Sequence, residues 1–158
     1  MDSIRIFGYK SFKKLSVQLH PINLLIGANG AGKSNFLSLF EMLGNIYEKR
    51  LGAYVAQVGG VDKLLYQGRK VTDRIAVNLL IAKSEYDLAL LESDGKLIVE
   101  REVVGCYDDV CPLDLARKNV ITEFQSESSL KDHKEEDLSN YISQIRKFHF
   151  HDTGRRSP

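Results

Sequence analysis

The chain has 158 residues, of which 43% are hydrophobic, and this composition suits one globular domain with a real core. The formal net charge of +1 excludes the global field of a nucleic-acid or membrane binder, and leaves room only for a local basic patch. The apolar runs fall far short of the ~18 residues that a membrane-spanning helix needs, and the first residues predict no signal peptide.

The N-terminal third predicts strands on both sides of a turn and then a helix. Residues 3–9 are rich in β-forming side chains, and residues 15–19 alternate between apolar and polar, so each is expected to form a strand. After the break at His20-Pro21, the run Ile22–Ile26 is nearly continuously apolar, which is typical of a buried central strand. Apolar residues then recur at helical spacing over residues 33–49, which predicts a helix with one face in the core.

The middle of the chain predicts an antiparallel meander, separate from the strand at 22–26. Glycines punctuate residues 51–73, where only residues 61–66 suggest a short helical turn. Three β-rich runs follow, and Ser93-Asp94-Gly95 between the last two is a hairpin signal. The runs cover residues 74–82, 86–92 and 96–104.

The C-terminal part is more polar. Residues 105–134 are poorly patterned, residues 135–146 carry an apolar stripe at helical spacing, and residues 147–151 are expected to form a short strand. The chain is thus predicted to be one domain over 1–158. Its parts are the strands, loop and first helix (1–50), an antiparallel β-lobe (70–105), and a linker, helix and short strand (106–158).

The stretch from Gly27 to Ser34 has the spacing G-x-x-x-x-G-K-S, which is typical of a phosphate-binding loop between a strand and a helix. Gly30 and Gly32 can adopt backbone angles closed to other residues, and they have no Cβ to block a phosphate. The backbone N–H groups and the helix start can then form an anion nest. The residues expected to bind the nucleotide are Gly27, Ala28, Asn29, Gly30, Ala31, Gly32, Lys33, Ser34 and Asn35.

Two side chains of this loop have distinct expected roles. Lys33 is expected to place a cation against the terminal phosphates, and the Ser34 hydroxyl to hold Mg²⁺. A glycine-rich turn that binds nothing is the alternative, but it does not explain why Lys33 and Ser34 stand at a helix start. The chain has no Asn-Lys-x-Asp for guanine selection, so ATP is favoured over GTP.

A phosphate loop also needs an acidic site that holds the metal and polarises water, usually an apolar strand that ends in Asp or Asp-Glu. The runs 88–92 and 97–100 imitate it, but both end in Glu and both flank the expected hairpin. An antiparallel hairpin contradicts the parallel arrangement that such a strand needs. No catalytic residue is therefore identified.

Other chemistry-bearing side chains have an ordinary structural interpretation beside a functional one. Phe12 either stacks on adenine or packs in the core, and Lys10 and Lys13 either touch phosphate or lie in a solvated turn. His149 and His151 share one face of the expected strand, with Asp152 beside them, which is compatible with Zn²⁺. A packed strand is the favoured alternative, because no second cluster exists. Cys106 and Cys111 have no metal-like spacing, which favours a reduced, cytoplasmic setting.

Two motifs together resemble the N-terminal part of ABC-type ATPase heads. They are Gly8-Tyr9-Lys10-Ser11-Phe12 and the apolar run that leads into Gly-Ala-Asn-Gly-Ala-Gly-Lys-Ser-Asn. The resemblance is closest to the RecF/SMC-like branch, including predicted bacterial ATPases of the AAA_21 and AAA_15 types, and Asn29 and Asn35 fit that branch. Residues 127–130 and 148–153 are also similar to segments of those ATPases.

This resemblance implies an α/β P-loop NTPase fold, with a mixed sheet around the loop and an antiparallel β-lobe beside it. It also implies a signature motif, an acidic Asp-Glu strand and a switch His, which do not occur in these 158 residues. The chain is therefore expected to be an N-terminal half, from a truncated or interrupted product. The family's Q-loop glutamine would be Gln125 or Gln144.

The function implied is ATP and Mg²⁺ binding in a RecF/SMC-like ATPase that acts on DNA or in defence. In such families two heads sandwich two ATP molecules, so the expected partner is a second head or a missing C-terminal half; DNA is a further candidate and a membrane is not. The chain alone is expected to bind nucleotide weakly and to hydrolyse almost none. The alternatives are a non-catalytic nucleotide-binding or interaction module and, less favoured, a small P-loop kinase.

Overall fold

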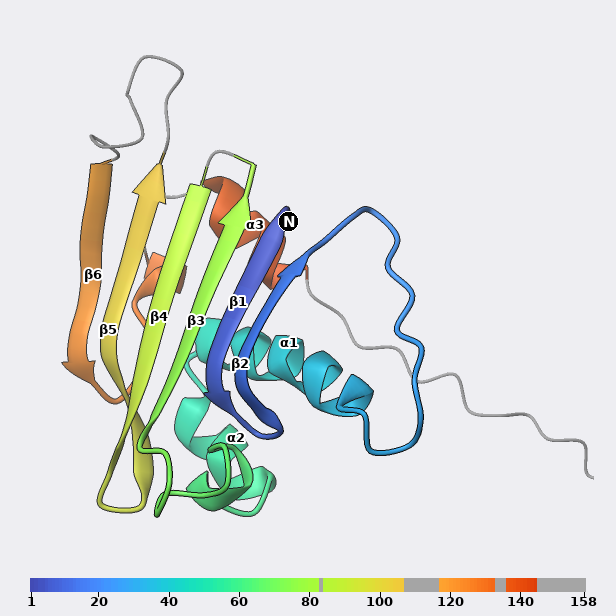
Figure 1. Cartoon of the computed structure of the whole chain (residues 1–158). Helices are drawn as coiled ribbons and strands as arrows, with labels where there is room; N and C mark the ends of the chain where they lie inside the picture. The colour runs from blue at the N-terminus through green and yellow to red at the C-terminus, as the bar shows by residue number, and fades with distance from the viewer. Residues whose placement is uncertain (83, 107–116, 133–135, 145–158) are drawn as a thin grey trace, which may run out of the picture.

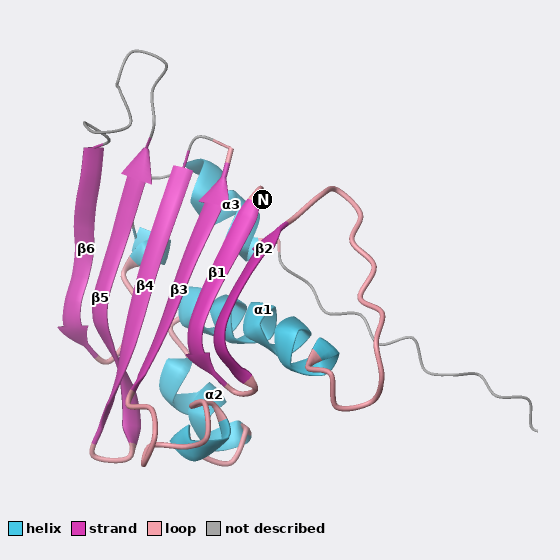
Figure 2. Cartoon of the chain, viewed as in Figure 1, coloured by secondary structure: helices cyan, strands magenta, loops and turns pink. Residues whose placement is uncertain are grey.

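The computed structural model describes residues 1–82, 84–106, 117–132 and 136–144. Six strands form one antiparallel sheet in the order β2-β1-β3-β4-β5-β6, and the helices lie against one face of it (Figure 1, Figure 2). The strands are β1 (Ser3–Tyr9), β2 (Phe12–Gln18), β3 (Arg74–Ile81), β4 (Ser84–Ser93), β5 (Lys96–Cys106) and β6 (Arg117–Gln125). The helices are α1 (Lys33–Tyr47), α2 (Leu51–Gln57) and α3 (Glu136–Ser143), with 3₁₀ turns η1 (Val61–Lys63) and η3 (Leu130–Asp132).

The core lies between the sheet and α1, because both elements have one apolar face. In β3 the buried residues alternate with half-buried ones, as a strand with two unlike faces requires. The α1 residues at helical spacing point toward these strands. The core residues from these two elements are Ile75, Val77, Leu79, Ile81, Phe36, Leu39, Met42, Leu43 and Ile46.

Most of the predicted elements are confirmed. Strands form at 3–9 and at the three runs of the meander, the turn at residues 94–95 closes the β4–β5 hairpin, and α1 begins at Lys33. The expected helix over 135–146 is present as α3, with Leu138 and Ile142 buried. The meander is continuous with the first strand, since β1 pairs with β3.

The prediction of a buried central strand at Ile22–Ile26 is wrong for this structure. These residues form no strand, and Ile22 and Ile26 are 83% and 90% exposed. β2 is the edge strand on this side of the sheet, and Ile22–Ile26 does not pair with its free edge. Among the described residues the sheet is therefore antiparallel throughout, not the mixed sheet expected around the loop.

Two elements were not predicted. β6 (Arg117–Gln125) forms where a polar linker was expected; it is an edge strand, and from Asn119 to Gln125 it exposes most of its side chains. α2 forms within the glycine-punctuated region and buries Leu51, Tyr54 and Val55. The expected strand at 147–151 lies outside the described residues. Within those residues, no helix combines the length and the apolar character needed to cross a membrane.

Candidate functional site

The N-terminal end of α1 has the features of an anion site. Gly32 is its N-cap residue, in the left-handed conformation (φ 92°), and it makes no side-chain capping bond. The first intrahelical bond runs from the Phe36 N–H to the Gly32 carbonyl at 2.8 Å. The N–H groups of the first turn thus have no helical partner, and the turn contains no acidic residue. Unpaired donors and the positive end of the helix dipole favour a bound anion here.

Lys33 adds a cation to these donors. Its Nζ donates to the carbonyl oxygens of Gly27 and Ala28 at 2.7 and 2.8 Å, so the side chain folds back across the loop. The Ala31 N–H donates to the Ala28 carbonyl at 3.2 Å and closes a turn inside the loop. Gly30 has a φ of 84°, which confirms the expected need for glycine at that position. The ammonium group is therefore held over the same loop that carries the free N–H groups.

Ser34 lies exposed in the first turn, next to Lys33, so its hydroxyl is open to solvent and to a metal ion. The acidic half of a metal site is not built by the described residues, which contain no group of three or more His, Cys, Asp or Glu that could hold a metal. Glu92 instead accepts the Gly95 N–H in the hairpin, and Glu100 pairs with Arg74. Both therefore have structural roles in antiparallel strands, as the hairpin signal predicted.

The β1–β2 turn is packed against the end of the loop. A Cβ at Gly32 would lie 3.0 Å from the Phe12 ring and 3.1 Å from the Ser11 hydroxyl oxygen. The Asn35 amide donates to that same hydroxyl at 2.9 Å. Phe12 is partly buried against the core, which is the structural interpretation of this residue. The two motifs that carried the family resemblance are thus in direct contact, although they are far apart in sequence.

A second group of bonds joins this turn to α1 one helical turn further on. The hydroxyls of Tyr9 and Ser38 are hydrogen-bonded at 2.9 Å, and the Lys10 Nζ donates to the Ser38 hydroxyl at 2.8 Å. The Tyr54 hydroxyl donates to the Ser38 carbonyl at 3.3 Å. Burial raises the pKa of the Tyr9 hydroxyl far above its usual range, and that of Tyr54 in the same direction. Lys10 is therefore bonded to the helix, not merely solvated as its turn position suggested.

Sequence reasoning missed the role of Ser38. The sequence did contain a sign of this role. Ser38 stands four residues after Ser34, so the two serines lie on the same face of the expected helix. It is a buried polar residue among the apolar core positions of α1. Such a residue needs a partner, and Tyr9 and Lys10 supply it.

The C-terminal end of α1 is held by the segment 126–132, which follows β6. The Glu127 carboxylate accepts the backbone N–H of Leu51, at the start of α2, at 3.0 Å. Lys131 pairs with Glu48 at 2.6 Å, and Lys49 pairs with Asp132. This segment includes residues 127–130, which resemble segments of known ATPases in sequence, and it contacts the start of α2 and the residues that follow α1.

Glu102 anchors that segment to the sheet. Its carboxylate is fully buried, and it accepts the hydroxyls of Thr122 and Ser128, both at 2.6 Å. The Tyr86 hydroxyl and the Ser129 N–H complete the set of donors. Burial is the main cause that raises the pKa of Tyr86 well above its usual value. One carboxylate thus connects β4, β5, β6 and the segment 126–132.

The remaining candidates lie away from the loop or outside the described residues. Gln125 ends β6, which is the opposite edge of the sheet from β2, and Gln144 follows α3. Among the described residues, no hydrogen bond joins either glutamine side chain to the loop, so the Q-loop assignment stays a prediction. His149, His151 and Asp152 lie outside the described residues.

Comparison with known protein families gives one match. A family model described as AAA ATPase domain matches residues 1–152. The comparison with curated proteins found no match. The matched span covers almost the whole chain and includes the loop, α1, the sheet and the segment 126–132.

Proposed function

Because the chain belongs to the AAA ATPase domain family, we propose that residues Gly27 to Asn35 bind the phosphates of ATP together with Mg²⁺. The family supports a nucleotide-binding, ATPase-like function. The observation that carries the assignment to these residues is the uncapped start of α1, over which Lys33 is held by the first carbonyls of the loop.

The chain's own groups would divide the work. The free N–H groups at the start of α1 would donate to the phosphate oxygens, and Lys33 would exchange a carbonyl oxygen for a phosphate oxygen. Ser34 would supply a hydroxyl to Mg²⁺, which prefers to keep water and phosphate oxygens as its other ligands. The Mg²⁺ ion, when bound, would neutralise charge on the terminal phosphates.

We propose further that the chain is the phosphate-binding portion of a RecF/SMC-like ABC ATPase that acts on DNA or in defence. The support for this proposal is the contact between the β1–β2 turn and the loop, which joins the two motifs of the resemblance. The partner we propose is a second ATPase head or a C-terminal half that completes the site. The exposed apolar run Ile22–Ile26 and the exposed Leu37 on α1 support such a partner, because apolar surface of this kind is usually covered.

Calorimetry of ATP-Mg²⁺ binding tests the phosphate site. We expect Lys33→Ala to lose about tenfold or more in affinity, because a charge-assisted bond to phosphate disappears. Lys96→Ala, on the exposed β4–β5 hairpin, is the matched control and should bind as the parent chain does. Equal ATP affinity in the parent chain and in Lys33→Ala would sink the assignment.

A non-catalytic nucleotide-binding module is the second candidate. The observation that favours it is the lack of an acidic metal cluster among the described residues. A turnover assay separates the two functions. Phosphate release that depends on Lys33 would support an ATPase, and binding without release would support the non-catalytic module.

A further inference from the structure

The face of the sheet opposite the helices contains a hollow of about 600 Å³ that the phosphate site does not use. Its floor is formed by Ala76 and Ala89, which are direct cross-strand partners on β3 and β4. Phe7 on β1 lies beside Ala76 and is 44% exposed, and Val103 and Val120 line the other side. The hollow exists because two small residues meet where the neighbouring strands carry larger ones. It is wide enough for bulky apolar side chains.

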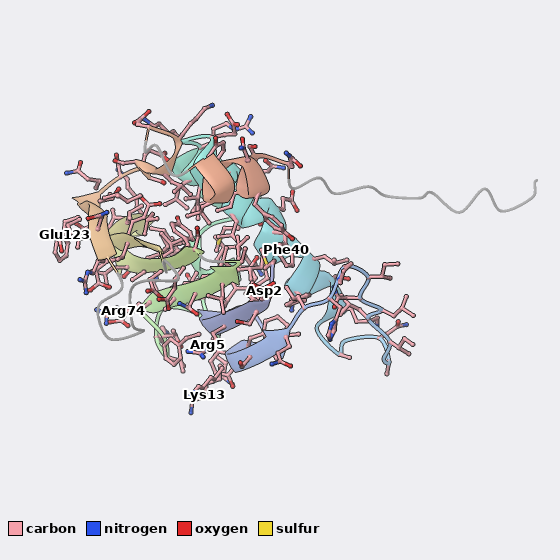
Figure 3. All side chains as sticks on the ribbon, turned by 90° about the horizontal axis from the view of Figure 1, so that it is seen from above. Asp2, Arg5, Lys13, Phe40, Arg74 and Glu123 are labelled. Atoms are coloured by element: carbon pink, nitrogen blue, oxygen red, sulfur yellow. The ribbon has the colours of Figure 1, made fainter. Side chains whose placement is uncertain are left out.

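Cations stand on both sides of this apolar floor. Arg5 and Lys14 line the hollow from β1 and β2, and Arg101 lines it from β5. Figure 3 shows Arg5 on the side of the sheet that faces away from the helices. The anion that lines the hollow, Asp87, accepts a bond from the Asn78 amide at 2.6 Å. Among the described residues, the lining therefore has three cations to one anion, in a chain whose overall charge is close to zero.

The cations are available for a partner. Arg101 has a long contact of 4.0 Å with Glu123, and both side chains are mostly exposed, so this pair is weak. Among the described residues, neither Arg5 nor Lys14 has a side-chain hydrogen bond or an ion pair. An acidic group that approached the rim would therefore gain attraction and would break no strong pair.

We propose that this hollow, defined by the residues named above, binds an acidic protein segment that inserts bulky apolar side chains over Ala76 and Ala89. Carboxylates of the segment, on both sides of these apolar side chains, would pair with Arg5, Lys14 and Arg101. A second copy of the same face fits poorly, because it would place cations against cations. Single-stranded nucleic acid fits less well, since it binds by stacking on several aromatic rings and Phe7 is the one aromatic ring among the described residues that line the hollow.

The test uses a fluorescent peptide of alternating glutamate with leucine or phenylalanine, and a matched peptide with lysine in place of glutamate. We expect the acidic peptide to bind the full chain and to shift the amide NMR signals of Arg5, Phe7, Ala76 and Arg101. The lysine peptide and an oligothymidine should bind at least about tenfold more weakly.

Two variants locate the binding. The double variant Arg5→Glu with Lys14→Glu reverses the charge of two of the three cations that line the hollow. The variant Ala89→Leu fills the hollow without a change in charge. Each should weaken the acidic peptide by about tenfold or more. The pair Lys63→Glu and Lys96→Glu makes the same charge change at exposed residues that do not line the hollow, and should stay within about twofold of the parent chain. Circular dichroism of each variant checks that it is folded.

The outcomes decide the proposal. Loss of binding in both hollow variants but not in the control supports it. Absence of peptide binding, preference for the lysine peptide or for oligothymidine, or equal losses in hollow and control variants would overturn it. ATP binding is unaffected by any of these outcomes, so the two proposals fail separately.

Discussion

The two ends of α1 are held in opposite ways. At the C-terminal end, side chains of the segment 126–132 reach Glu48, Lys49 and the start of α2, and Glu102 ties the segment to three strands. At the N-terminal end, the helix has a glycine cap and no side-chain capping bond. The comparison teaches that side-chain bonds fix the helix, through Asn35 and Ser38 near its start and through the segment 126–132 at its C-terminal end. The N–H donors of its first turn can then stay unpaired for a ligand, at little risk to the fold.

The largest expected effect comes from the loss of Glu102, which holds the segment at the C-terminal end of α1. Glu102→Ala should lower the free energy of unfolding by about 3 kcal/mol or more, because the three buried hydroxyls of Tyr86, Thr122 and Ser128 lose their acceptor at once. Urea denaturation of Glu102→Ala beside Glu123→Gln, an exposed carboxylate on β6, measures it. A loss no larger than that of the exposed control would contradict the role of Glu102 as the anchor.

Substitutions of two glycines, at the start and in the interior of α1, test the N-terminal end of the helix. Gly32→Ala should lower stability by about 1–3 kcal/mol, because residue 32 has a positive φ and its new Cβ would meet Phe12. Gly44→Ala should instead raise it by about 0.5–1 kcal/mol, since nothing lies within 4 Å of its Cβ in the helix interior. Thermal melts of both variants compare them, and the same sign for both would argue against the strained cap.

The bond between the β1–β2 turn and α1 should appear in the pH dependence of stability. The pKa of Tyr9 is raised by burial, so the folded state keeps this proton while the unfolded chain loses it above about pH 10. Its contribution is complete below that pH and is lost as the pH rises further. Tyr9→Phe should cost about 1 kcal/mol at neutral pH and should reduce the alkaline decline seen in urea titrations. An unchanged decline would exclude Tyr9 as one of its sources.

The smallest expected effect concerns the exposed ion pair between Lys131 and Glu48. The hydrogen bond with Glu48 raises the pKa of Lys131, but both side chains are largely solvated. Lys131→Ala should therefore change the unfolding midpoint very little. A large loss, in the range expected for Glu102→Ala, would show that surface charges hold this end more than the buried network does.

Two apolar runs explain how far the fold was predictable. Arg74–Ile81 and Ile22–Ile26 both predicted strands, yet only the first forms one. β3 has a neighbour on each side, whereas Ile22–Ile26 has none among the described residues. A local pattern states that a segment can pair, but whether it does pair depends on contacts with the rest of the sheet, which the pattern does not contain.

The glycine conformations at residues 30 and 32 and the start of α1 at Lys33 were predicted well, because this geometry is local. The glycine positions, Lys33 and the helix start all lie within a few residues, so their spacing was sufficient. The bonds of Asn35 with Ser11 and of Ser38 with Tyr9 were not predicted, since they join segments far apart in sequence. β6 was missed for a related reason: an edge strand with polar side chains carries a weak pattern.

The pairing of β1 with β3 sets an order in which the molecule can fold. Ser3 pairs with Leu80, so the loop and α1 lie within the span of chain that this contact closes. The β1–β2 and β3–β4 hairpins join neighbours in sequence, and such short closures precede long ones. We therefore expect both hairpins to form before the sheet is complete. A chain caught at that stage would contain every residue of the phosphate loop, but Ser11 and Phe12 would not yet support Gly32.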